Sequence, residues 1–125
     1  MTSTVPAFDA LERIFHEPNR LAIMSTLCGA GNRGMAFNEV KAVCKLTDGN
    51  LNRHLKVLEE SGAIKIAKTF VQDKPRTTVS LSTQGIQRFH QYLEALAQVL
   101  KQAQKSLPAE RPAASVFAIA RKAAR

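Results

Sequence analysis

The sequence predicts a single, mainly helical α+β domain that contains one small β-hairpin. Three patterns support this fold class: helical apolar spacing up to residue 60, alternating spacing after Gly62, and a heptad repeat after Ser82. A chain of 125 residues with 45% apolar content can bury a real core within one domain. We therefore expect one domain over residues 1–107, followed by a basic tail over residues 108–125.

The net charge of +8 is placed unevenly along the chain. Residues 1–60 contain seven Lys or Arg and seven Asp or Glu, whereas residues 61–125 contain eleven against three. Such a basic surplus attracts polyanions, which makes nucleic acid the first partner to consider and an anionic membrane the second. The sequence has neither an apolar run of the ~20 residues that a membrane span needs nor a secretion signal. We therefore expect a cytoplasmic protein with no membrane partner.

Two helices are expected before the first glycine-rich segment. Residues 7–16 have apolar side chains at helical spacing, and Glu17 before Pro18 is expected to end this helix. The shared face would carry Phe8, Leu11 and Phe15. A second helix over residues 19–28 is apolar on more than one side, so it should be largely buried.

A glycine-rich turn and a short third helix are expected next. Three glycines between residues 29 and 34 break the second helix, and residues 35–37 can form a very short strand. Asn38 is a candidate N-cap for a third helix over residues 39–45, whose valines would face inward.

The helix expected over residues 47–61 has the clearest pattern in the sequence. Thr47 is its natural N-cap, and Gly62 ends it because glycine tolerates the left-handed conformation at this position. Its apolar stripe consists of Leu51, Leu55 and Leu58. Together with the short helix before it, this helix forms a helix-turn-helix pattern.

The opposite face of this helix carries small and polar side chains. These residues are Gly49, Arg53, Lys56 and Glu60, with Asn50 and Asn52 on the two flanks of the face. Arginine and lysine read guanine edges and phosphates, and asparagine reads adenine, so the face suits a DNA major groove. The alternative is an ordinary solvated helix face.

Residues 64–81 alternate between apolar and polar side chains, which predicts a β-hairpin. The polar turn is expected over residues 72–76, so that Lys74 and Arg76 give the hairpin a basic tip. Because two strands alone are marginal in water, the hairpin should lean on the helices and can pair with residues 35–37.

Ser82 is expected to cap a long final helix over residues 83–107 that has a regular heptad repeat. The repeat positions are Ile86, Phe89, Leu93, Leu96, Leu100, Ala103 and Leu107. In a chain this small the expected partner is a second copy, although the first helix of the same chain could cover these positions instead. We expect a homodimer interface formed by Phe8, Leu11, Phe15, Ile86, Phe89, Leu93, Leu96 and Leu100. The basic tail is either a solvated segment or an extra arm on DNA phosphates.

The sequence contains no catalytic, metal or cofactor constellation, so we do not expect an enzyme. Its three histidines are scattered, and it has neither a glycine-rich phosphate loop nor a distinct pair of carboxylates. His54 flanks the leucine stripe and should pack between helices or contact a phosphate. Cys28 and Cys44 lie on apolar faces without metal-ligand spacing, which indicates packing residues.

The order of these elements, and motifs within them, resembles the winged helix-turn-helix transcription regulators of the broad MarR/ArsR type. Residues 18–24, P-N-R-L-A-I-M, look like the start of the second helix in the ArsR-like branch. Residues 47–62, T-D-G-N-L-N-R-H-L-K-V-L-E-E-S-G, look like the recognition helix. K-P-R-T-T at residues 74–78 and L-S-T-Q-G at residues 81–85 resemble the wing and the start of the dimer helix.

The resemblance implies a homodimeric regulator of transcription that binds double-stranded DNA sequence-specifically. The helix over residues 47–61 would lie in the major groove, and the wing over residues 72–76 would lie on flanking phosphates or in the minor groove. The expected DNA-binding residues are Thr47, Gly49, Asn50, Asn52, Arg53, Lys56, Lys74, Arg76 and Thr77. The alternative is a winged-helix module that binds RNA or a partner protein. No pattern specifies a small-molecule effector.

Two departures from the family pattern limit what the resemblance implies. ArsR-type sensors carry a paired-cysteine metal box, of which only Cys44 is present, so no metal site is carried over. MarR wings read D-x-R, whereas Pro75 lengthens this wing, so either Lys74 or Arg76 could occupy the minor groove.

Overall fold

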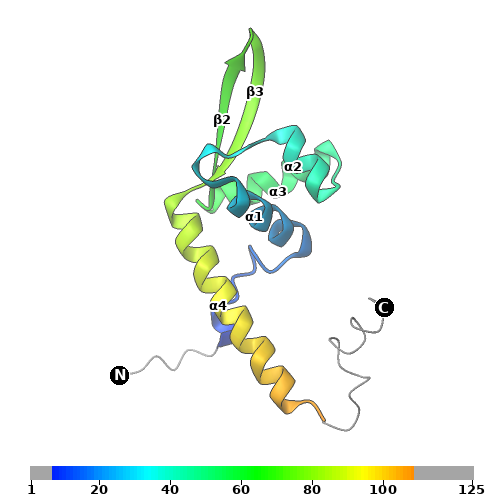
Figure 1. Cartoon of the computed structure of the whole chain (residues 1–125), viewed down its shortest axis with the longest axis vertical. Coiled ribbons are helices and arrows are strands. Elements are labelled where there is room, and N and C mark those ends of the chain that lie inside the picture. Colours follow the sequence, from blue (N-terminus) through cyan, green and yellow to red (C-terminus); the bar gives the residue numbers. More distant parts are fainter. Residues whose placement is uncertain (1–6, 109–125) are drawn as a thin grey trace.

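The protein is described by a computed structural model that covers residues 7–108. In chain order its elements are the 3-10 helix η1 (Ala7–Ala10), α1 (Pro18–Ala30), the 3-10 turn η2 (Gly31–Arg33), β1 (Met35–Ala36), α2 (Phe37–Cys44), α3 (Asp48–Glu60), β2 (Ile64–Val71), β3 (Lys74–Leu81) and α4 (Thr83–Ser106). Helices α1 to α3 form a helical unit from which the β2–β3 hairpin and helix α4 extend in opposite directions (Figure 1). The mainly helical fold with a small hairpin is confirmed.

The hairpin is more regular than the sequence predicts, and its turn is shorter. Strands β2 and β3 contain eight residues each and pair antiparallel along their whole length. Only Gln72 and Asp73 connect them, with φ values of 53° and 63°, the left-handed pair that a tight two-residue turn requires. The turn predicted over residues 72–76 is therefore wrong, because residues 74–76 already belong to strand β3.

The two-residue strand β1 completes a three-stranded sheet in the order β1-β3-β2. Met35 pairs with Val79, and Ala36 pairs with Thr78. The predicted pairing of this short segment with the hairpin is confirmed, and it attaches the base of the hairpin to the helical unit.

The ends of α3 and α4 are formed by the residues that the sequence predicts. Asn50 N–H donates to Thr47 Oγ1 at 3.1 Å, and Gly85 N–H donates to Ser82 Oγ at 2.8 Å. Gly62 follows α3 with a φ of 85°, a left-handed conformation that favours glycine. Local sequence therefore determines where both helices begin and where α3 ends.

Helix α2 begins earlier than predicted. It starts at Phe37, so Asn38 is not its N-cap. Instead the Glu39 carboxylate accepts a hydrogen bond from Ala36 N–H at 2.9 Å, which satisfies a free amide at the start of the helix.

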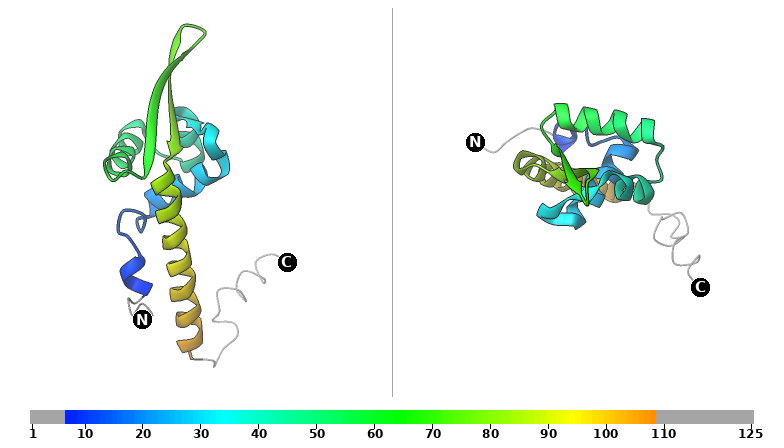
Figure 2. Two further views of the ribbon diagram at one scale, coloured as in Figure 1. Left: turned by 90° about the vertical axis from the view of Figure 1, so that its left-hand side faces the viewer. Right: turned by 90° about the horizontal axis from the view of Figure 1, so that it is seen from above.

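The predicted first helix over residues 7–16 is wrong, because only Ala7–Ala10 is helical and the rest forms turns. Tertiary contacts determine the conformation of this segment. Phe15 is fully buried, with its ring centroid 5.4 Å from that of Phe89 and 5.8 Å from that of Tyr92. The N-terminal segment therefore lies beside α4 (Figure 2). It inserts one aromatic side chain, that of Phe15, into the core.

Arg88 joins the N-terminal segment, α4 and the end of α3. Its guanidinium donates to both carboxylate oxygens of Glu12, at 2.7 and 3.2 Å, and to the carbonyl oxygen of Ser61 at 2.7 Å. The same group lies 5.5 Å above the ring of Phe15. A two-pronged Arg–carboxylate contact is directional as well as strong, so it holds the segment in one orientation.

Helix α4 turns only part of its heptad row toward the core. The exposed positions of the row include Ile86, Leu93, Leu100 and Leu107. Phe89 is buried, and Leu96 packs against the core cluster. Phe15 and Phe89 are therefore corrected from dimer contacts to core residues, because the N-terminal segment of the same chain covers this side of α4.

Three further expectations concern the surface. Within residues 7–108, no helix is long and apolar enough to cross a membrane. Cys28 is exposed and not a buried packing residue, whereas Cys44 is half-buried. The predicted basic tail lies outside the described residues from residue 109 onward.

The end of α3, the base of the hairpin and the start of α4 meet in one close contact. Ser82 Oγ donates to the carbonyl oxygen of Gly62 at 2.6 Å, and Ser82 N–H donates to that of Ala63 at 3.1 Å. A Cβ on Gly85 would overlap the Ala63 carbonyl group. The packing of α4 on this junction therefore requires a glycine inside a helix.

His54 holds α3 against α1 from a buried position, being 5% exposed. Arg20 Nη1 donates to His54 Nδ1 at 3.1 Å, and Glu17 Oε1 lies 3.8 Å from the same nitrogen. Because Nδ1 accepts this hydrogen bond, the imidazole is neutral. Burial lowers the pKa of His54, and the opposing effect of the Glu17 carboxylate is smaller. The expectation that His54 packs between helices is confirmed.

We expect Gly85→Ala to destabilise the protein by about 3 kcal/mol, because the new methyl group would push α4 away from Ala63. The matched control is Gly29→Ala in α1, where nothing lies within 4 Å of the new Cβ. The free energy of unfolding of this control should rise by up to about 1 kcal/mol, because alanine has the better helix propensity. Chemical denaturation measures both changes, and equal effects of the two substitutions would contradict the close-approach explanation.

The stability of the protein should fall as the pH drops through the ordinary pKa of histidine, about 6.5. In this range the unfolded chain binds a proton at His54 and the native state, with its lowered pKa, does not, so protons favour unfolding. His54→Gln removes this titration but keeps a hydrogen-bonding side chain. Between about pH 7.5 and about pH 5, the melting temperature of the wild type should fall more than that of His54→Gln. A constant difference between the two proteins would rule out His54 as the source.

Candidate nucleic-acid interface

Helix α3 separates an apolar face from a polar one. Leu51, Leu55 and Leu58 are buried in the core cluster. On the opposite side, the predicted DNA-binding positions Thr47, Gly49, Asn52, Arg53 and Lys56 are exposed and Asn50 is half-buried. The predicted division of this helix into a core face and a polar face is confirmed. We call these six positions of the polar side the reading face.

The acidic residue at the start of α3 is paired. Asp48 accepts a hydrogen bond from Lys41 Nζ of α2 at 2.7 Å. A carboxylate in the first turn also complements the positive end of the helix dipole. The ion pair offsets a negative charge beside the reading face that would otherwise repel phosphates.

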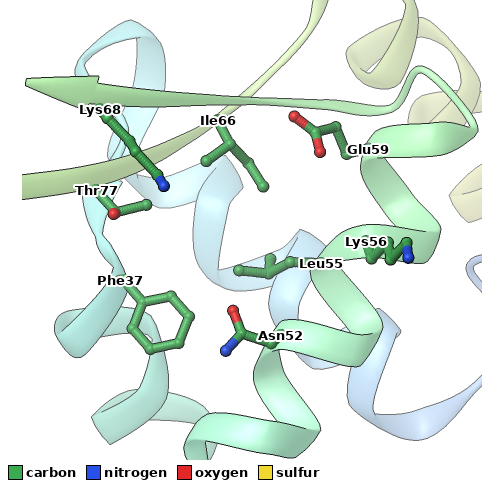
Figure 3. Close-up of a pocket in the computed structure, with 8 residues that line it drawn as sticks. All are labelled: Phe37, Asn52, Leu55, Lys56, Glu59, Ile66, Lys68 and Thr77. Carbon is green, nitrogen blue, oxygen red and sulfur yellow. The ribbon is translucent and has the colours of Figure 1, made fainter.

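An open groove of about 710 Å³ separates α3 from the hairpin. Its lining residues are Phe37, Asn52, Leu55, Lys56, Glu59, Ile66, Lys68 and Thr77. Lys68 and Ile66 extend from the hairpin into the groove opposite Leu55 and Asn52 of α3 (Figure 3). The groove therefore has an apolar floor and a polar rim, with a lysine on each side.

Lys68 is a groove residue that the sequence prediction missed. Side chains alternate along a strand, and Ile66 packs against the core cluster, so Lys68 two positions later shares its face. Its cross-strand partner is Thr77, which was predicted and also lines the groove. The period-two pattern of strand β2 was the signal that could have identified Lys68.

Lys74 and Arg76 lie on the other face of the hairpin. They pair with Val71 and Thr69, which alternate with the groove-lining residues of β2. Arg76 Nη2 also lies 3.8 Å from the Glu39 carboxylate of α2. The structure thus brings Thr77 together with the reading face but directs Lys74 and Arg76 away from the groove.

Nothing in this region resembles a metal centre. Within residues 7–108, no group of three or more His, Cys, Asp or Glu side chains could hold a metal ion. The groove offers hydrogen bonding, apolar contact and two positive charges, from Lys56 and Lys68, against the one negative charge of Glu59. This balance suits a polyanion with exposed base edges.

Comparisons with known proteins agree with this geometry. A family model described as a winged helix DNA-binding domain matches residues 19–100, which include both walls of the groove. An uncharacterized protein of Methanocaldococcus jannaschii is 33% identical over 89 residues, covering 71% of this chain and 95% of that protein. The family is one of DNA-binding domains and not of enzymes.

Solved structures share the same arrangement. A transcriptional regulator homologue from Pyrococcus horikoshii OT3 is 32% identical, with a TM-score of 0.69, covering 77% of this chain and 94% of that chain. The MepR F27L mutant of S. aureus, bound to an oligodeoxyribonucleotide, has a TM-score of 0.63 at 19% identity and covers 83% of this chain and 75% of that chain. At that identity MepR supports the fold alone. With the family model matching well over half of its length, the chain belongs to the family of winged helix DNA-binding domains.

Proposed function

We propose that this protein is a transcriptional regulator that binds double-stranded DNA sequence-specifically as a homodimer. We call the β2–β3 hairpin the wing. The observation that carries the proposal is the groove between α3 and the wing. It sets the polar side chains of the helix and those of the wing on one open face. Thirteen residues of α3 span about 20 Å, and an α-helix fits the width of a DNA major groove, about 12 Å.

In this mode Asn52 and Arg53 of α3 contact base edges in the DNA major groove. The phosphate backbone that borders the major groove then lies in the protein groove between α3 and the wing. Lys56 and Lys68, which line the groove from its two sides, would neutralise that backbone. The outward-facing Lys74 and Arg76 would contact flanking phosphates. Base choice therefore belongs to α3, and most of the charge attraction belongs to the wing.

The homodimer is proposed to form through the exposed apolar row of α4. Ile86, Leu93 and Leu100 repeat every seven residues over about 21 Å of α4, and Leu107 follows directly after the last residue of the helix. Phe8 is exposed on the N-terminal segment, which packs beside α4, and would extend the same surface. Leu11 and Leu96 are partly buried against the core and would contribute at its edge. Two chains related by a two-fold axis could then place their α3 helices in successive major grooves, about 34 Å apart.

Selection of bound sequences from random DNA duplexes tests the proposal directly. The expected result is enrichment of an inverted repeat whose half-sites lie about 10 base pairs apart. Affinity for the enriched duplex should fall steeply with salt, because phosphate contacts release counterions. No enrichment, or tighter binding to RNA of the same sequence, would overturn it.

Substitutions in α3 and in the wing should have different signatures. Arg53→Ala should cost about 1–3 kcal/mol on the enriched duplex and relax its sequence preference, because a base contact is lost. Lys68→Ala should weaken binding to all duplexes alike and reduce the salt slope by about 1. Fluorescence anisotropy titrations at several salt concentrations measure both quantities. Lys101→Ala on α4 removes the same charge away from the groove and serves as the control. If Arg53→Ala kept the full sequence preference, the assignment of the reading face would be wrong.

Leu93→Glu should convert the dimer to a monomer, because it places a charge in the middle of the exposed apolar row. Leu93 is 41% exposed, so the folded monomer can accommodate the carboxylate. DNA affinity should fall with dimerisation, since each half-site is then bound alone. The matched control is Gln91→Glu, which adds the same charge on the opposite side of α4. Sedimentation of both variants at micromolar concentration measures their oligomeric state. A dimeric Leu93→Glu variant would contradict this interface.

A further inference from the structure

Arg88 is a partly buried charged side chain that lies outside the proposed DNA-binding face. It belongs to α4, one turn after Gly85, and its side chain is 28% exposed. Its guanidinium bonds Glu12 of the N-terminal segment and also Ser61, the residue that ends α3. The N-terminal segment, α3 and α4 are therefore all joined at one side chain.

The carboxylate of Glu12 fixes the direction in which the Arg88 guanidinium points. Arg88 Nε donates to Glu12 Oε2 at 3.2 Å, and Nη2 donates to Oε1 at 2.7 Å. This two-pronged contact leaves Nη1, which donates to the carbonyl oxygen of Ser61 at 2.7 Å. Because the guanidinium is planar and rigid, a carboxylate that holds two of its nitrogens also aims the third.

Two polar contacts along α4 fix the angle between this helix and α3. The first is the close approach of Gly85 to the Ala63 carbonyl group, about which α4 alone could still pivot. The second is the hydrogen bond from Arg88 to Ser61, about 4.5 Å further along the axis of α4. Phe89 also packs in the core, but an apolar contact is not directional, whereas a hydrogen bond weakens steeply when its angle changes.

This angle determines the separation of the two reading faces in the proposed homodimer, because α4 carries the dimer surface. Arg53 lies eight residues before Ser61, or about 12 Å along α3. A rotation of about 8° in each protomer would therefore move the two Arg53 positions by up to about 3.4 Å relative to each other, which is the rise of one base pair. Small changes at the end of α3 are thus enough to change which half-site spacing fits.

We propose that Arg88 is a positioning residue that selects the spacing between the two half-sites of the bound DNA. This inference rests on the proposed function and adds to it a residue that determines specificity without contacting DNA. Each base pair inserted between the half-sites turns one of them by about 35° around the DNA axis. A dimer whose α3 helices are held at one angle therefore accepts one spacing.

Duplexes that carry the enriched inverted repeat, with its half-sites moved closer together or further apart by one base pair, test this inference on the full chain. The wild type should bind the enriched spacing at least about tenfold more tightly than either neighbour, or about 1.4 kcal/mol. Arg88→Gln should reduce this preference to about threefold or less, because α4 can then pivot against α3. Both proteins should bind a duplex with one half-site equally, since α3 and the wing are unchanged.

Two further variants control for charge and for stability. Arg13→Gln removes the same charge from an exposed side chain that takes part in no hydrogen bond or ion pair within residues 7–108, and it should keep the wild-type preference. Glu12→Gln leaves Arg88 and its bond to Ser61 in place but weakens the contact that aims it, so its preference should be intermediate. Its side chain is 36% exposed, so this variant should fold even if Arg88→Gln does not. Circular dichroism melting curves show which variants are folded at the assay temperature.

The spacing preference distinguishes a positioning residue from one that only stabilises the fold. If Arg88→Gln melts at a lower temperature but keeps the full spacing preference, the inference is overturned and the proposed function stands. An equal loss of preference in Arg13→Gln would also overturn it, because the effect would then follow from the lost charge. If the wild type itself enriches no inverted repeat, the proposed function fails first.

Discussion

The whole arrangement depends on the close approach of backbone at the junction of α3, the hairpin and α4. Gly85 lies against the carbonyl group of Ala63, and Ser82 bonds the carbonyl oxygens of Gly62 and Ala63. Arg88 adds a contact to the end of α3 one turn further along α4. Since backbone atoms cannot be repacked as side chains can, the directions of the hairpin and of α4 relative to α3 are set here. The junction therefore links the proposed DNA-binding face to the proposed dimer surface.

Helix α3 can hold its exposed polar side chains in fixed positions because its inner side is packed tightly against the core. Three leucines and His54 are buried beneath it, and the neutral imidazole accepts a hydrogen bond from Arg20 of α1. Only a helix with a fixed inner side can hold long polar side chains in a defined register over base edges. The groove then adds the wing as a second wall. Its apolar floor and its polar rim, in which Lys56 and Lys68 outnumber Glu59, fit the proposed path of a phosphate backbone beside the reading face.

Predictions from local pattern succeeded where short-range contacts decide the outcome. The caps at Thr47 and Ser82 and the glycine after α3 were all found, because each involves residues within a few positions of one another. The N-terminal helix failed for the opposite reason: Phe15 reaches an aromatic cluster formed by residues more than seventy positions away. The heptad row also misled in part. A heptad repeat does not show which of its positions pack against the same chain and which remain exposed.

The sequence by itself determined the order of the elements, the polar and apolar faces of α3, and the basic character of the second half. These properties follow from periodicity, capping chemistry and charge, which are readable along the chain. Only the tertiary structure decided which side chains meet. It placed Lys68 on the side of the groove opposite Lys56, turned Arg76 to the other face of the wing, and left Phe70 exposed at the tip. The physical reason is that strand register and the packing at Gly85 fix these positions through contacts between residues far apart in the chain.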